Sequence, residues 1–185
     1  MDLIKRALKL SIIGGLTYWV GLYLLHQAQL DFSSLSDWLF RGVLVIFVVL
    51  TIVATKAAKS GWLSFSEGFR VGMLATGILA IFIAVGTWLY CEYMYPSYTH
   101  DYEQEYRTMH YDKMMRKYIA ETWKRDTVTQ GARDTIQRGL DLNIKNYTGH
   151  MFTTQGQVQT NFVYSFFWGV MITLTVALLA RKVEE

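Results

Sequence analysis

The stretch that decides the fold is Leu63–Gly72, LSFSEGFRVG, which leads into the apolar run Val71–Tyr90. Ser64 is followed three positions later by Glu67, and a hydroxyl residue with Glu at this spacing before an apolar run is typical of a capping box. We expect each of these two side chains to bind the other residue's backbone N–H, and Arg70 to pair with Glu67 on the same helix face. The stretch therefore predicts the start of a membrane helix, where unsatisfied backbone groups are costly. A role for it in binding or gating stays open.

Four stretches of the chain carry almost no charge, and 52% of the 185 residues are hydrophobic. A helix needs about 20 apolar residues to cross a bilayer core. The third and fourth stretches meet that length, and the first and second do so when they end at Gln27 and Ala58. The stretches are Leu10–Leu25, Trp38–Ala54, Val71–Tyr90 and Phe162–Ala180.

The fold class predicted from these stretches is an all-α membrane protein with four transmembrane helices. Region 1–95 holds the first three, at about 8–29, 38–58 and 65–94. Region 96–160 forms an extracytoplasmic helical insertion between the third and fourth helices. Region 161–185 holds the fourth transmembrane helix and the C-terminus.

The basic residues beside the apolar stretches predict the orientation. Short loops rich in Lys and Arg stay in the cytoplasm. We therefore expect both termini and the 56–70 loop to be cytoplasmic, and the long 91–161 segment to lie outside. The basic residues are Lys5, Arg6 and Lys9 before the first stretch, Lys56, Lys59 and Arg70 between the second and third, and Arg181 and Lys182 after the fourth.

Small residues recur at every fourth position in the third and fourth stretches. This spacing lets membrane helices approach closely, and close approach is the main source of packing energy in lipid. We expect these faces to pack, either on each other or on a partner's helix. They are Gly68, Gly72, Thr76, Ala80 and Ala84 in the third stretch, and Ser165, Gly169, Thr173 and Ala177 in the fourth. A looser set in the first stretch is Ser11, Gly14, Gly15 and Gly21.

The segment between the third and fourth stretches is predicted to form two amphipathic helices, 97–124 and 127–147, followed by a polar return at 149–160. They could form a hairpin, or the first could continue the third transmembrane helix; Pro96 favours a kink or break. Apolar residues recur every four positions in the second helix, from Val128 to Ile144. Aromatic stripes more often pack than bind ligands such as sugars or cations, so we expect the stripe of the first helix to contact the second helix or a partner protein. That stripe is Tyr98, Tyr102, Tyr106 and Met109.

The arrangement as a whole resembles the Bacteroidota membrane proteins of domain-of-unknown-function family 4199. The residues that carry the resemblance are the Ser-Phe-x-Glu-x-Phe-x-x-Gly pattern, the aromatic stretch YCEYMYPSY, and the polar helical segment before a last span. The pattern is formed by Ser64, Phe65, Glu67, Phe69 and Gly72. The resemblance covers nearly the whole chain. It implies a bacterial inner membrane and four transmembrane helices, and no activity or catalytic residue.

We predict no catalytic residue, cofactor or metal. The chain contains no phosphate-binding or dinucleotide fingerprint and no Gly-x-Ser-x-Gly. The four histidines are expected to face solvent on the outer side, because no pair has the i, i+4 spacing of a helical zinc motif. Cys91 is the only cysteine, which excludes an intrachain disulfide, and the net charge of +3 gives no case for nucleic acid. The histidines are His26, His100, His110 and His150.

Two segments outside the membrane match a three-residue pattern of bacterial O-glycosylation. They are Asp126-Thr127-Val128 and Asp134-Thr135-Ile136. Patterns this short occur by chance, so the sequence leaves their modification open.

Two classes of function remain besides an enzyme that would use the outer histidines and acids. The first is a non-catalytic structural or accessory subunit of a larger inner-membrane complex, in contact with lipids, other membrane proteins or further copies of itself. The alternative is a small transporter or lipid-handling protein that acts as a homo-oligomer. Because the apolar stretches hold no ionisable residue away from their ends, a transport path would depend on hydroxyls. Those available are Thr17, Tyr18, Thr51, Thr55, Thr76, Thr87 and Thr173.

Overall fold

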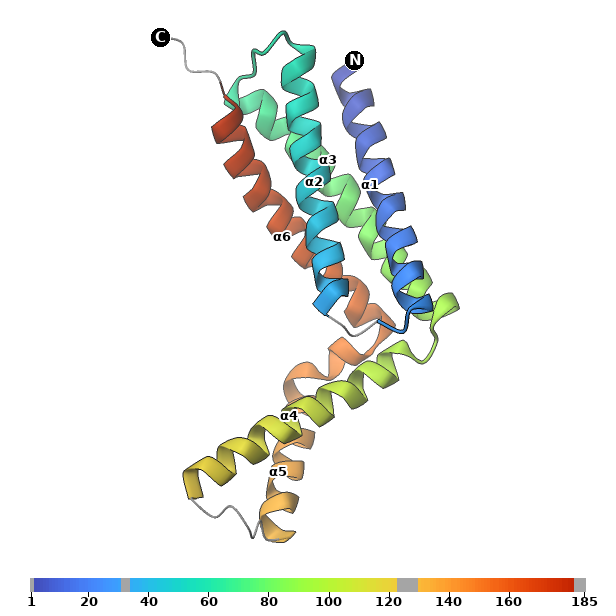
Figure 1. The fold of residues 1–185 in the computed structure, drawn as a ribbon, viewed down its shortest axis with the longest axis vertical. Coiled ribbons are helices and arrows are strands. Elements are labelled where there is room, and N and C mark those ends of the chain that lie inside the picture. The colour runs from blue at the N-terminus through green and yellow to red at the C-terminus, as the bar shows by residue number, and fades with distance from the viewer. Residues whose placement is uncertain (1, 31–33, 123–129, 182–185) are drawn as a thin grey trace. The chain divides into compact units, whose positions relative to one another are not determined.

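A computed structural model describes residues 2–30, 34–122 and 130–181 of the chain (Figure 1). Within these residues the regular structure is entirely helical. The longer helices are α1 (Asp2–Gln27), α2 (Ser34–Ala58), α3 (Phe65–Leu89), α4 (Tyr98–Thr122), α5 (Gln130–Asn143) and α6 (Thr154–Ala180). Three short segments, the π-helices η1 (Tyr90–Met94) and η2 (Ile144–Thr148) and the 3₁₀-helix η3 (Gly149–Phe152), link them.

The chain divides into two compact units. The four-helix unit comprises Met1–Tyr90 together with Val158–Glu185, and the α4–α5 unit comprises Cys91–Gln157. Among the residues that the structure describes, four helices are long and apolar enough to cross a membrane, which confirms the predicted number. Their apolar segments are Ile4–Gln27, Trp38–Ala58, Phe65–Met94 and Thr154–Ala180.

The start of the fourth apolar helix differs from the prediction. The polar stretch 149–160 is expected to lead back to the membrane, but α6 already begins at Thr154. The reason is a local cap: Thr153 has extended backbone, and its Oγ1 accepts from the N–H of Gly156 at 3.0 Å. A cap of this kind satisfies a free N–H of the first turn and starts a helix whatever the hydropathy of the next residues.

The turn between α2 and α3 contains the predicted capping box. Ser64 Oγ accepts from the N–H of Glu67 at 3.3 Å, and Glu67 Oε2 accepts from the N–H of Ser64 at the same distance. The expected pairing of Glu67 with Arg70 is wrong, because the partner of the carboxylate is Lys59. The turn explains the difference: Ser60 and Gly61 have φ of 55° and 87°, and this left-handed backbone folds the end of α2 back toward α3.

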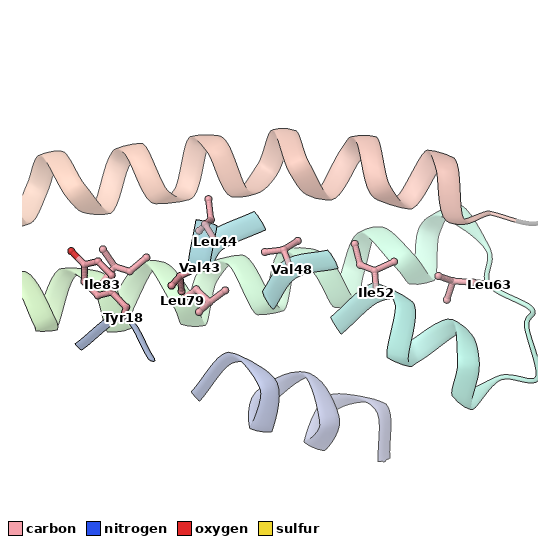
Figure 2. Packing of buried hydrophobic residues seen from close by; sticks show 8 residues of the cluster. All are labelled: Tyr18, Val43, Leu44, Val48, Ile52, Leu63, Leu79 and Ile83. Atoms are coloured by element: carbon pink, nitrogen blue, oxygen red, sulfur yellow. The ribbon is translucent and has the colours of Figure 1, made fainter. Parts of the chain in front are cut away.

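Helix α3 is the central element of the four-helix unit. Half of its apolar window is buried, a larger share than in α1, α2 or α6. Large apolar residues from α1, α2 and α3 form the core, and in α2 they recur every four residues at Leu44, Val48 and Ile52 (Figure 2). The buried cluster comprises Tyr18, Val43, Leu44, Val48, Ile52, Leu63, Leu79 and Ile83. Small residues on the remaining face of α3 leave room for α6.

The α4–α5 unit begins after a break in the helix. Regular helix stops at Met94 and resumes at Tyr98, which confirms the predicted interruption at Pro96, since proline has no N–H to donate. Of the predicted helices 97–124 and 127–147, the structure describes α4 up to Thr122 and α5 from Gln130 to Asn143, followed by η2, whereas residues 123–129 lie outside the described residues. The α5 period is confirmed where it is described, because Ile136, Leu140 and Ile144 are buried; its predicted member Val128 lies outside the described residues.

Candidate functional site

Helices α3 and α6 approach each other closely at a contact lined by small residues. We call it the α3–α6 seam and define it by Gly68, Gly72 and Thr76 on α3 and by Gly169, Thr173 and Ala177 on α6. A Cβ added at Gly72 would lie 2.5 Å from Cγ2 of Thr173, and one at Gly169 would overlap the Thr76 side chain. A Cβ at Gly68 would lie 3.4 Å from Cβ of Ala177. The structure thus brings the two small-residue stripes together within one chain.

The burial of α6 follows this stripe. Among the residues from Phe162 to Ala180, the four buried ones are Ser165, Gly169, Thr173 and Ala177. On α3, Ala80 is buried and Ala84 is half-buried. Helix α6 therefore buries its small-residue face in the unit, while Ile172, Val176 and Ala180 beside that face are partly buried against the core.

Two hydrogen bonds connect the facing helices. The hydroxyls of Thr76 and Thr173 lie 3.2 Å apart, both fully buried. Further along α3, Nδ2 of Asn161 donates to Oγ1 of Thr87 at 3.0 Å. Such bonds between membrane helices contribute on average about 0.6 kcal/mol each. The sequence analysis missed Asn161; its signal is an amide placed one turn before the first stripe residue, Ser165.

The glycines of α1 serve a different purpose from those of the seam. Each receives a large side chain: Gly14 lies against Phe47, Gly15 against Phe82, and Gly21 against Leu39. The contact with Phe82 is as close as those of the seam, since a Cβ at Gly15 would lie 2.6 Å from Cβ of Phe82. The looser set of small residues predicted in the first stretch thus provides holes that neighbouring side chains fill.

A tryptophan fixes α1 to α3 near these glycines. Nε1 of Trp19 donates to the backbone oxygen of Phe82 at 2.8 Å. Gly86, one turn further along α3, leaves room for the indole ring, since a Cβ there would lie 2.5 Å from its Cδ1. The hydrogen bond from Trp19 to Phe82 thus joins α1 to α3 without an ionisable group.

Most of the hydroxyls that could form a transport path donate inside their own helices. Thr51 donates to the oxygen of Phe47 and Thr55 to that of Thr51, both at 2.7 Å. Thr87 donates to Ile83, at 2.9 Å, and exposed Thr17 donates in the same way to Ile13. Ser11 and Ser165, which are also buried, follow this pattern. The hydroxyl protons of these six residues are therefore engaged by backbone carbonyls one turn back.

In the α4–α5 unit the predicted tyrosine stripe packs on a residue that the sequence analysis missed. The rings of Tyr102 and Tyr106 have centroids 5.7 and 5.3 Å from that of Phe152 in η3. Tyr98 stacks on Tyr102 at 6.0 Å. Met109, the fourth member of the stripe, stays 58% exposed. The three tyrosines are thus half-buried within their own unit, and Met109 remains open to a partner.

An arginine joins the two helices of this unit. Nη1 of Arg107 donates to Asp141 on α5 at 2.6 Å, and Nη2 lies 2.7 Å from Glu103 on its own helix. The carboxylates of Asp141 and Glu103 raise the pKa of Arg107 above its ordinary value. This arrangement orients two helices and leaves both carboxylates engaged.

The start of α4 is held by a carboxylate. Asp101 accepts from the hydroxyls of Tyr95 and Ser97, at 2.8 and 2.9 Å. These bonds, that of Tyr95 first, lower the pKa of Asp101. The bonds join the turn around Pro96 to the first turn of α4.

The histidines lie apart from one another in the contacts that the structure gives. Nδ1 of His26 lies 3.4 Å from the hydroxyl oxygen of Tyr90, and Nδ1 of His100 lies 3.5 Å from Oδ1 of Asp101. Nδ1 of His110 lies 3.0 Å from the backbone oxygen of Tyr106. Across residues 2–30, 34–122 and 130–181, no three His, Cys, Asp or Glu side chains converge as a metal site would require.

Only one of the two segments that match the glycosylation pattern lies among the described residues. Asp126-Thr127-Val128 lies outside the described residues. In Asp134-Thr135-Ile136, the Thr135 hydroxyl donates to the oxygen of Gly131 at 2.8 Å, and Ile136 is buried in the α4–α5 unit. A sugar attached to Thr135 Oγ1 would replace the hydroxyl proton, and this hydrogen bond would be lost.

Comparison with known proteins gives one match. A family model described as "Protein of unknown function (DUF4199)" matches residues 9–182. The match covers all four apolar helices nearly completely and the α4–α5 unit. Neither the curated proteins nor the solved structures gave a match.

Proposed function

The chain belongs to the DUF4199 family, and we propose that this protein is a non-catalytic structural or accessory subunit of a larger membrane complex. The proposal places it in the bacterial inner membrane, with both termini cytoplasmic and residues 91–161 in the periplasm. The observation that carries the proposal is the closed interior of the four-helix unit. Its small-residue stripes and its hydroxyls are engaged with each other or with their own helices.

A closed interior favours a structural role over transport. A solute path needs polar groups that can exchange partners as the solute moves, and coupled transporters place ionisable residues at membrane depth. In the four-helix unit, the described hydroxyls of Thr51, Thr55 and Thr87 donate to carbonyls, and those of Thr76 and Thr173 face each other. These contacts support a unit whose helices are held in one arrangement.

Because the small-residue stripes of α3 and α6 pack on each other, a partner helix would have to dock on another surface. The seam is occupied, so a neighbouring span would dock on other exposed apolar surface; α1 and α2 also offer such surface, and we place the partner on the exposed face of α6. That face is apolar and aromatic, and its exposed members include Phe162, Phe166, Phe167, Trp168 and Met171. In the α4–α5 unit, exposed Met109 and Leu142 are the corresponding contacts for a partner outside the membrane. Membrane lipids would cover whatever part of α6 the partner leaves free.

Mass spectrometry after gentle extraction tests the proposal. The chain, tagged at its C-terminus, is extracted in a mild detergent at native expression level, and the co-purifying proteins are quantified. We expect one or a few integral membrane proteins at a fixed ratio to the bait. A homo-oligomer that carries bound lipid or solute and no foreign subunit would contradict the proposal and favour the transporter or lipid-handling alternative.

Two double variants test whether the exposed face of α6 is the docking surface. Phe167→Ala with Met171→Ala alters the exposed face of α6 and should reduce the co-purifying subunits while leaving the bait folded. Ile46→Ala with Leu50→Ala makes a comparable change on exposed residues of α2 and should retain them. Equal loss in both pairs would show that α6 does not provide the docking face.

A further inference from the structure

Basic side chains gather at one end of the four-helix unit. Figure 1 shows the first turns of α1, the α2–α3 turn and the last turn of α6 at this same end. The basic end comprises Lys5, Arg6 and Lys9 on α1, Lys56 and Lys59 at the end of α2, Arg70 on α3, and Arg181 after α6. Among the described residues of the unit, Arg41 is the one Lys or Arg that lies elsewhere.

This end carries an excess of positive charge. Positions 1–9, 56–70 and 181–185 hold eight Lys or Arg residues against four Asp or Glu residues. Among the side chains that the structure describes there, Glu67 is the only carboxylate, and Lys59 pairs with it. The remaining described cations at this end make no ion pair with a described carboxylate. Lys5, Arg6, Lys9, Arg70 and Arg181 are exposed, so an anion from outside the chain can reach them.

The surroundings of these cations are amphipathic. On α1, Lys5 and Lys9 stand next to Ile4 and Leu8, which are 61% and 44% exposed. Trp62, exposed in the α2–α3 turn, is of the type that collects at the membrane–water interface. A phospholipid matches this arrangement, with its phosphate beside the cations and its acyl chains along the apolar helix surface. A free phosphate ion would contact only the cations and leave the neighbouring apolar side chains uncovered.

We propose that the basic end of the four-helix unit binds the headgroups of anionic phospholipids. Clusters of four to eight basic residues directly beside membrane helices attract anionic lipid. The interaction would select the charge of the headgroup and hold lipid in contact with α1 and the α2–α3 turn. It does not depend on the role of the protein as an accessory subunit.

Native mass spectrometry of the full chain in a neutral detergent tests this proposal. The protein is titrated with phosphatidylglycerol and with phosphatidylcholine of the same acyl chains, and the bound lipid is counted. We expect phosphatidylglycerol to bind more tightly, with an affinity that falls as salt is raised because the charges are exposed. Equal binding of the two lipids would overturn the proposal. Displacement of the lipid by inorganic phosphate at comparable concentration would show that the site is one for phosphate and would overturn the lipid assignment.

Charge-matched variants locate the binding. Lys5→Gln, Lys9→Gln and Arg70→Gln together remove three charges from the basic end and should weaken phosphatidylglycerol binding by about fivefold for each charge. Arg41→Gln, Arg133→Gln and Arg138→Gln remove three exposed charges elsewhere and should leave it unchanged. Lys5→Arg, Lys9→Arg and Arg70→Lys keep the charge and should bind as the unaltered chain does, which controls for effects on folding. Equal loss in the two Gln variants would contradict the assignment to the basic end.

Discussion

Gly169→Ala adds one methyl group to the α3–α6 seam at its tightest point. A Cβ at this position would overlap Cγ2 of Thr76 and lie 2.8 Å from its Oγ1 and 3.0 Å from its Cβ. Because Oγ1 and Cβ of Thr76 also crowd the added carbon, rotation of this fully buried side chain does not relieve the overlap. We therefore expect the two helices to move apart.

The expected cost has two parts. Forcing an extra carbon into a packed core costs about 1–3 kcal/mol. Separation also weakens the hydrogen bond between Thr76 and Thr173, and bonds of this kind between membrane helices contribute about 0.6 kcal/mol. We expect Gly169→Ala to lower the free energy of unfolding by about 1–3.5 kcal/mol.

Unfolding of the full chain in mixed micelles with a rising fraction of denaturing detergent, followed by circular dichroism, measures this loss. The matched control is Gly42→Ala on α2, where a Cβ would meet nothing within 4 Å, and we expect its change to stay within about 0.5 kcal/mol. Thr76→Ala in the Gly169→Ala background removes the overlapping methyl group and should recover part of the loss. Equal stability of Gly169→Ala and Gly42→Ala, or no recovery in the double variant, would refute the reasoning.

Three further predictions concern other contacts. Ser64→Ala removes the side-chain cap of α3 and should cost about 1 kcal/mol in the same unfolding assay, whereas Ser66→Ala in the same turn should be close to neutral. Asn161→Leu combined with Thr87→Val in a double-mutant cycle should give a coupling of about 0.5–1.5 kcal/mol, and a coupling of zero would mean that their hydrogen bond does not form. Because hydrogen bonds lower the pKa of Asp101 below its ordinary value of 3.8, its contribution to stability is complete above that pH and is lost as the pH falls through the folded pKa. Asp101→Asn should therefore reduce the acid-induced loss of stability measured below about pH 4, and an unchanged pH profile would contradict this role.

The sequence carried enough information for features that depend on local chemistry. The four apolar helices follow from windows of about 20 residues that only a bilayer accommodates. The capping box of Ser64 and Glu67 follows from spacing within one turn, and the break at Pro96 from the missing N–H. Each of these depends on residues within a few positions of one another, and the structure contains all three.

Contacts between residues that only the folded backbone brings together could not be predicted from local sequence patterns. Lys59 reaches Glu67 because Ser60 and Gly61 adopt left-handed backbone, whereas sequence spacing alone favoured Arg70. Phe152 packs on the tyrosine stripe from a 3₁₀-helix more than forty positions away along the chain. The stripes of α3 and α6 were evident in the sequence, but small residues fit a neighbouring molecule as well as they fit each other.

The central claim is that these two stripes pack on each other within a single chain. A cysteine pair at Thr76 and Thr173, in a Cys91→Ser background that removes the sole native cysteine, tests it most directly, because the two hydroxyl oxygens lie 3.2 Å apart. The membranes are treated with a mild oxidant or a short thiol cross-linker, and the products are separated by mass, with each single cysteine as control. The account predicts a cross-linked monomer from the double variant alone. Cross-linked dimers, or free thiols in both positions, would contradict it.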